Sequence, residues 1–116
     1  MEYVNLGLSG AQVSKIVLGE MSFGEPSLQT HGSPSWVATK EQALKVLKKA
    51  WDLGINFIDK ANVYSQGRSE EIIGEFIKDY DREAFVIATK VYFPVGNRPN
   101  DRVCRGSTLC GRSGSP

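Results

Sequence analysis

Long hydrophobic runs and an excess of charge of one sign are both missing from this 116-residue chain. Its apolar stretches, such as 16–18 and 84–88, fall far short of the roughly 20 residues that a membrane helix needs, so we expect no membrane insertion. Lys and Arg number 14 against 13 Asp and Glu, which gives a net charge of +1. A balance this even offers no strong field for nucleic acid or anionic lipid, so we expect no nucleic-acid partner.

Cysteine and histidine are equally scarce. Cys104 and Cys110 are the two cysteines, and His31 is the single histidine. No second cysteine pair completes a zinc-site spacing, so we expect neither a metal site nor a structural disulfide. The first residues carry Glu2 and no basic residue before Lys15, and they lack the charged start and apolar core of a signal peptide. The cytoplasm is therefore the expected location.

The apolar residues that are present form short runs typical of strands. The runs at 3–6 and 12–14 flank glycine turns, a pattern that predicts a small hairpin acting as a lid or plug. Compact apolar runs without strict alternation indicate strands buried on both faces. We expect such a strand at residues 15–19, a second strand ending in a carboxylate at residues 55–59, and a third, buried strand at residues 85–89.

Helix signals separate these strands. Thr39 and Gln42 have capping-box spacing, and Gly54 follows as a left-handed end of the first helix. Ser69 is the expected N-cap of a second helix, followed by two acids that the helix dipole favours. Each helix has one apolar stripe: Ala43, Leu44, Leu47, Ala50 and Trp51 in the first, and Ile72, Ile73, Phe76, Ile77 and Tyr80 in the second. The alternation predicts an α/β fold with parallel strands, whose ligands bind at the carboxyl ends of the strands.

Three chemistry-bearing side chains follow the ends of these strands. Asp59 ends the second strand, Tyr64 comes soon after it, and Lys90 follows the third. An ammonium beside a phenol stabilises the phenolate and makes the phenol a better proton donor, while a carboxylate holds the ammonium in place. The spacing alone leaves a simpler alternative open, in which Asp59 and Lys90 form an ordinary ion pair and Tyr64 packs.

Linked motifs around these residues favour the chemical interpretation. Over residues 1–100 the sequence resembles the aldo-keto reductases, in particular the shaker-like branch that includes potassium-channel β subunits. The motifs that carry the resemblance are Leu18-Gly19-x-Met21-Ser-Phe-Gly24, Asp59-x-Ala61-x-x-Tyr64, Gly67-x-Ser69-Glu70-x-x-Ile73-Gly74 and Thr89-Lys90. A complete barrel of this family has eight strand–helix units and roughly 250 residues. The resemblance thus implies the N-terminal portion of a (β/α)8 TIM barrel, truncated after the hairpin, three parallel strands and two helices.

The resemblance also implies an activity and a cofactor. The family reduces aldehydes or ketones with NADP(H), so a small carbonyl compound is the implied substrate. By resemblance, Tyr64 would protonate the carbonyl oxygen, Lys90 would strengthen Tyr64 as an acid, and Asp59 would orient Lys90. Four positions correspond to family positions near the nicotinamide end of the cofactor: Gly19, Glu20, Met21 and Asp59.

Two residues within these motifs depart from the family pattern. Glu20 stands where a small or hydroxyl residue is usual, and an ionised carboxylate there would weaken binding of an anionic cofactor. If Asp59 faces the mouth, strand alternation turns Lys60 toward the helix layer, where an unpaired ammonium is costly to bury unless it reaches solvent. The catalytic histidine of the family has no counterpart, since we interpret His31 as a solvated loop residue. We therefore expect the truncated chain to be inactive alone.

The last residues suggest a boundary. Residues 101–116 show no helix or strand period, which predicts an irregular, disordered and non-family tail after a partial barrel of residues 1–100. We interpret this tail as out-of-frame or alternatively spliced coding sequence. Two alternatives to a reductase stay open: a non-catalytic fragment that binds a protein through an exposed sheet edge, and an unstable truncated product. Three aromatic residues are expected either to line a substrate pocket or to cover the core: Trp36, Tyr92 and Phe93.

Overall fold

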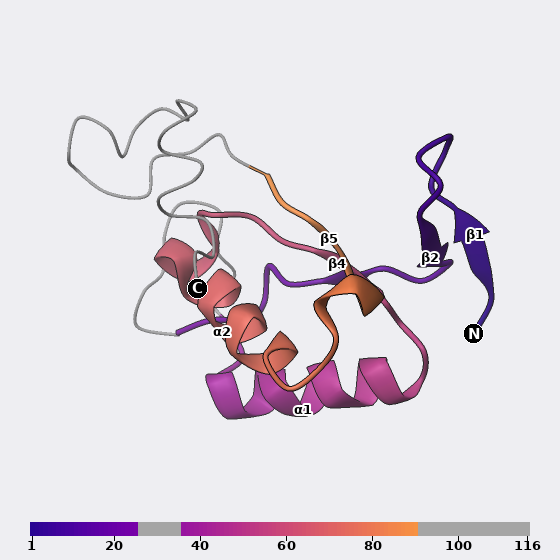
Figure 1. The fold of residues 1–116 in the computed structure, drawn as a ribbon. Helices are drawn as coiled ribbons and strands as arrows, with labels where there is room; N and C mark the ends of the chain where they lie inside the picture. Colours follow the sequence, from indigo (N-terminus) through magenta and orange to yellow (C-terminus); the bar gives the residue numbers. More distant parts are fainter. Residues whose placement is uncertain (26–35, 91–116) are drawn as a thin grey trace.

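The computed structural model describes residues 1–25 and 36–90 of the chain. Within these residues a hairpin precedes alternating strands and helices, which confirms the predicted α/β order (Figure 1). Short 3₁₀ turns at Tyr64–Gly67 and Arg82–Ala84 precede α2 and β5. The strands and helices are β1 (Tyr3–Asn5), β2 (Gln12–Ser14), β3 (Leu18–Gly19), α1 (Lys40–Asp52), β4 (Phe57–Asp59), α2 (Arg68–Ile77) and β5 (Val86–Ala88).

The predicted N-terminal hairpin is present and is tied to the start of β4. Strands β1 and β2 pair antiparallel, with Tyr3 opposite Ser14. The Tyr3 hydroxyl donates to the Gly54 carbonyl oxygen over 2.7 Å, and the Ser14 amide donates to Asn56 Oδ1 over 2.8 Å. Gly54 and Asn56 both precede β4, so the hairpin lies at the amino end of that strand, away from its carboxyl end.

The parallel sheet has its carboxyl ends aligned. In the described residues its order is β3-β4-β5, with both neighbouring pairs parallel. Asp59 is the register partner of Gly19 on one side and of Ala88 on the other. The backbone pairing continues past the strands, because the amide of Asn62 donates to the Lys90 carbonyl oxygen over 3.1 Å. This register brings the residues that follow each strand to one edge.

Two helices cover the same side of this sheet, as Figure 1 shows. The capping box that begins α1 is present: the Gln42 amide donates to Thr39 Oγ1, and the Thr39 amide donates to Gln42 Oε1. Gly54 follows α1 with φ of 90°, as expected for a left-handed helix end. The predicted apolar stripes meet β4 in one buried cluster, formed by Phe23, Ala43, Leu47, Ile58, Ile72, Ile73, Phe76 and Phe85.

The first parallel strand is shorter and more exposed than its apolar run predicts. Only Leu18 and Gly19 form β3, and neither is fully buried. The preceding Ile16 and Val17 are 58% and 43% exposed, so the prediction of a strand buried on both faces is wrong. The reason is position, since β3 is an outer strand of the described sheet. The other outer strand, β5, is likewise only partly buried, so the prediction of a buried third strand is also wrong.

The start of α2 also differs from its prediction. The helix begins at Arg68, and Ser69 does not cap it. The preceding 3₁₀ turn runs directly into the helix, so the Arg68 amide already donates to the carbonyl oxygens of Tyr64 and Ser65. Gly67, with φ of 93°, makes this continuation possible. The Ser69 hydroxyl is consequently available for a contact outside the helix.

Several sequence predictions fall outside the described residues. They concern His31, both cysteines, Tyr92, Phe93 and the tail at 101–116. Trp36 is described and is 70% exposed, so it does not cover the core. Its expected place in a substrate pocket stays a prediction.

Candidate active site

The three predicted catalytic side chains lie together at the carboxyl ends of the strands. Lys90 Nζ is 2.7 Å from Asp59 Oδ1 and 5.5 Å from the centre of the Tyr64 ring. Asp59 is the last residue of β4, Lys90 follows β5, and Tyr64 opens the 3₁₀ turn before α2. Both members of the ion pair are about half exposed, with 51% of the Lys90 side chain and 43% of the Asp59 side chain accessible. This front cluster of Asp59, Tyr64 and Lys90 is thus open to a ligand.

The charge of Lys90 is stabilised within the front cluster. Burial, the largest single contribution, lowers the pKa of Lys90, because it removes water from the ammonium. The hydrogen bond to Asp59 and the charges of Tyr64 and Asp59 together outweigh that loss, so the pKa of Lys90 lies above its ordinary value of 10.5. The site therefore keeps a permanent cation beside a phenol.

Three of the four residues expected near a nicotinamide surround open space. Gly19 is level with Asp59 in the sheet, and a methyl group added at Gly19 would meet no atom of residues 1–25 and 36–90 within 4 Å. Met21, shortly after the end of β3, is 46% exposed. The strand ends at Gly19, Asp59 and Met21 therefore leave room for a ligand beside the front cluster.

Glu20, the fourth of these residues, points away from that space. Its side chain is fully buried and accepts a hydrogen bond from the Ser69 hydroxyl over 3.1 Å. Burial raises the pKa of Glu20 to about 8, against smaller lowering effects from Ser69 and Lys60. At neutral pH this carboxyl is protonated, so it does not bring the negative charge that an ionised carboxylate would place beside an anionic cofactor. The Glu20 amide still donates to the Asp59 carbonyl oxygen over 3.1 Å, which ties it to the strand end.

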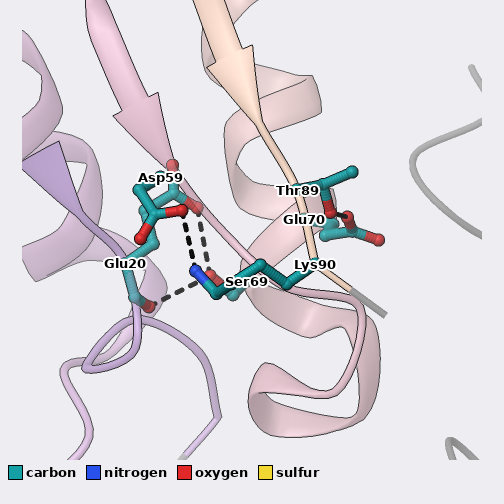
Figure 2. A network of polar contacts seen from close by, with 6 residues as sticks. All are labelled: Glu20, Asp59, Ser69, Glu70, Thr89 and Lys90. Atoms are coloured by element: carbon teal, nitrogen blue, oxygen red, sulfur yellow. Dashed lines mark hydrogen bonds and ion pairs between the residues drawn. The ribbon is translucent and has the colours of Figure 1, made fainter. Parts of the chain in front are cut away.

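A second polar cluster lies on the opposite side of the same strand ends. Lys60 is turned toward the helix layer, as strand alternation predicts, but it is paired: its Nζ is 3.1 Å from Glu70 Oε1. The cost of burying an unpaired ammonium therefore does not arise, because Glu70, on α2, pairs with it. The same oxygen accepts a hydrogen bond from Thr89 Oγ1 over 2.9 Å. In Figure 2, Thr89 meets Glu70 while Lys90, the next residue, extends toward Asp59.

Glu70 is a site residue that the sequence reasoning missed. The sequence predicts only a helix-dipole contribution from its carboxylate, yet the side chain is 2% exposed. Glu70 precedes Ile73 by three residues, and Ile73 lies on the buried stripe, so helical spacing alone places Glu70 on the same face. An acid on a buried face needs a cationic partner, and Lys60, which faces the same helix layer, is that partner.

A close approach of two loops holds the turn that carries Tyr64. A methyl group added at Gly24 would overlap the side chain of Ser65, the residue after Tyr64. Ser65 is 1% exposed and has φ of 47°. The Gly24 amide also donates to the Ala38 carbonyl oxygen over 3.1 Å. Glycine at 24 therefore lets the segment after β3 pack directly on the Tyr64 turn.

Two negative findings apply to residues 1–25 and 36–90. No group of three or more His, Cys, Asp or Glu side chains in this described part is arranged to hold a metal ion. No helix in the same part has the length and apolar character to cross a membrane.

Comparison with known proteins places this geometry in one family. The model of the aldo/keto reductase family matches residues 15–108. The chain is 43% identical over 102 residues to versiconal hemiacetal acetate reductase of Aspergillus parasiticus, covering 86% of this chain and 28% of that protein. It is 42% identical over 98 residues to a candidate voltage-gated potassium channel subunit beta of Schizosaccharomyces pombe, covering 82% of this chain and 26% of that protein.

A solved structure agrees with the sequence comparisons. A thermostable aldo-keto reductase, solved with the inhibitor epalrestat, superimposes with a TM-score of 0.64 and 33% identity, over 87% of this chain and 34% of that one. The chain thus spans about a third or less of the proteins it matches. The parallel sheet and two helices are the corresponding part of a TIM barrel. On this evidence the chain belongs to the aldo/keto reductase family.

Proposed function

We propose that this chain is the N-terminal part of an NADP(H)-dependent reductase that converts aldehydes or ketones to alcohols, with Tyr64 as the proton donor. Family membership supports oxidoreductase chemistry on a carbonyl substrate. The observation that carries the finer proposal is the Lys90 ammonium, held 2.7 Å from Asp59 and 5.5 Å from the Tyr64 ring centre. An ordinary ion pair needs no phenol beside it. A phenol that donates a proton does need a nearby cation, which stabilises the phenolate that remains.

Each front residue has one task in this proposal. The Tyr64 hydroxyl donates its proton to the carbonyl oxygen of the substrate, and the Lys90 ammonium stabilises the negative charge left on the phenol oxygen. Asp59 holds Lys90 in position through their hydrogen bond. The chemistry that bound NADP(H) supplies is a hydride for the carbonyl carbon. Gly19 and Met21 leave the space in which a nicotinamide fits beside Asp59.

The proposal includes inactivity of the 116 residues alone. These residues correspond to 28% of versiconal hemiacetal acetate reductase and 34% of the thermostable reductase. A complete barrel closes its sheet with eight strands, and the closed sheet is what shapes the mouth around a ligand. A chain that supplies the proton donor but not the closed barrel holds its substrate poorly, so turnover requires the remainder of the barrel.

A chimeric barrel tests the proposed proton donor. Residues 15–90 of this chain would replace the corresponding segment of the thermostable reductase, and carbonyl-dependent oxidation of NADPH would be followed spectrophotometrically. We expect Tyr64→Phe to lower kcat by about 10²- to 10⁴-fold, the range of general acid catalysis. Tyr80→Phe is the matched control, since Tyr80 packs with Trp51 and Phe76 away from Lys90. A folded, active chimera in which Tyr64→Phe changes kcat no more than Tyr80→Phe would refute the role.

A second candidate function is association with a protein partner. It is favoured by the exposure of Ile16 and Val17 beside the outer strand β3. Sedimentation of the purified chain distinguishes the two candidates. A stable monomer at high micromolar concentration argues against association through β3, and a self-associated chain that Val17→Lys returns to monomers supports it.

A further inference from the structure

We propose that Glu70 is a positioning residue that sets the geometry of the Asp59–Lys90 pair from the opposite side of the strand ends. The catalytic consequence rests on the function proposed above, but the positioning itself does not. Glu70 touches neither Asp59 nor Lys90 in the described contacts. It holds Lys60 and Thr89, which are the sequence neighbours of those two residues.

One oxygen atom makes both contacts. Glu70 Oε1 lies 3.1 Å from Lys60 Nζ and accepts from Thr89 Oγ1 over 2.9 Å. Asp59 precedes Lys60 at the end of β4, and Thr89 precedes Lys90 at the end of β5. Glu70 therefore links the two strand ends through the side chains that face α2, those of Lys60 and Thr89. Asp59 and Lys90 link the same strand ends on the side of the mouth.

Alternation makes the two links depend on each other. Successive side chains in an extended segment point to opposite faces, so fixing Thr89 against the helix directs Lys90 toward the mouth. A half-exposed ion pair contributes little net stability, because its attraction is largely offset by the side-chain entropy lost when the lysine is held in one conformation. The Asp59–Lys90 hydrogen bond orients Lys90, and an anchor that fixes both strand ends below it narrows the range of geometries that this exposed pair adopts.

Burial makes Glu70 a rigid anchor. Its side chain is 2% exposed and that of Lys60 is 11% exposed, so both are held by packing between α2 and the sheet. Helix α2 is also continuous with the 3₁₀ turn that carries Tyr64. Displacing Glu70 would thus shift both strand ends relative to the Tyr64 turn. The competing explanation is that Glu70 only neutralises Lys60, with the backbone pairing of Asn62 and Lys90 fixing the mouth.

The isosteric change Thr89→Val separates these explanations, because it removes the Glu70–Thr89 hydrogen bond without changing charge. The measurement is the rate at which an amine-acylating reagent labels Lys90 near pH 9, read by peptide mass spectrometry on the full chain. Circular dichroism confirms that each variant is folded. We expect labelling of Lys90 to rise about threefold in Thr89→Val, because a freed amine loses part of its bond to Asp59. Thr89→Ser keeps the hydroxyl and should label at the wild-type rate.

Two results would overturn the inference. One is a folded Thr89→Val chain in which Lys90 labels at the wild-type rate, and the other is a Thr89→Ser chain shifted as far as Thr89→Val. If Thr89→Val does not fold, Glu70→Gln replaces it, with Glu71→Gln as the matched control. Glu71 lies one residue along α2 and pairs with Arg68 instead. Equal labelling of Lys90 in these two variants would then refute the inference.

Failure of the proposed function would be recognised separately. Labelling requires neither NADPH nor a carbonyl compound, so it reports positioning even if the chimera shows no turnover dependent on Tyr64. If the chimera is active, Thr89→Val should lower kcat and shift its pH profile, while Thr89→Ser preserves both. A role limited to stability would leave the pH profile of the folded enzyme unchanged.

Discussion

The front and the back of the strand ends each carry a lysine paired with an acid, but the front pair is exposed and the back pair is buried. On the front, the Asp59–Lys90 pair is about half exposed, with side-chain accessibilities of 43% and 51%. On the back, the Lys60–Glu70 pair is nearly buried, with 11% and 2%. The exposed pair contributes little to stability and is free to meet a ligand, whereas losing one partner of the buried pair leaves a charge without water. Because neighbouring side chains alternate, each strand end places one residue in the exposed front pair and its neighbour in contact with the buried Glu70.

The largest effect expected on the back side is a pH dependence caused by Glu20. Its carboxyl has a pKa of about 8 in the folded chain against 4.5 ordinarily, and it faces Ser69, Lys60, Glu70 and Asp59. Between these pH values the unfolded chain has released this proton and the folded chain retains it. The free energy of unfolding therefore falls as pH rises from about 4.5 to about 8, by about 5 kcal/mol from this group.

Urea unfolding at a series of pH values measures this effect. Glu20→Gln keeps a buried amide that accepts from Ser69 and does not titrate, so its stability should lack this part of the pH dependence. The decisive quantity is the difference between wild type and Glu20→Gln. A difference that stays constant from pH 4.5 to 8 would show that folding does not raise the pKa of Glu20.

Breaking the buried pair gives the next largest effect. Glu70→Ala leaves the Lys60 ammonium buried without a partner, and we expect a loss of about 3–5 kcal/mol in the free energy of unfolding. Glu71→Ala is the control, because Glu71 is exposed and pairs with Arg68; its loss should stay under about 0.5 kcal/mol. Similar losses in the two variants, measured by urea unfolding, would remove the distinction between front and back.

A smaller effect is expected where the segment after β3 meets the Tyr64 turn. Gly24→Ala would overlap Ser65, and we expect it to cost about 1–3 kcal/mol by thermal or urea unfolding. Gly19→Ala is the control, since a methyl group there meets nothing within 4 Å in the part of the chain that the structure describes. If both variants are equally stable, the Gly24–Ser65 contact does not constrain the turn.

The smallest stability effect is expected on the front. Asp59→Asn removes the charge of a half-exposed partner, so the free energy of unfolding should change by less than about 1 kcal/mol. A loss as large as that of Glu70→Ala would mean that the front pair is structural, and would argue against its catalytic role.

The sequence predicted the front cluster better than the back cluster. Short apolar runs fixed the order of strands and helices, and parallel strands have aligned ends, so Asp59 and Lys90 were expected together. The contacts of Glu20 with Ser69 and of Lys60 with Glu70 join residues ten or more positions apart, and they depend on where α2 packs on the sheet. Helix-end preferences predict that Ser69 is an N-cap. They do not show that a 3₁₀ turn precedes the helix, whose carbonyl oxygens accept from the Arg68 amide.

Titration of Lys90 in the folded 116-residue chain shows whether the front cluster holds a stabilised ammonium. With ¹⁵N-labelled lysine, the Nζ resonance would be followed by NMR as pH rises, in wild type and in Asp59→Asn. We expect the pKa of Lys90 to lie above 10.5 in wild type and to fall in Asp59→Asn, because the bond to Asp59 stabilises the ammonium. A folded wild-type chain whose Lys90 titrates at or below 10.5, with no change in Asp59→Asn, would contradict this expectation.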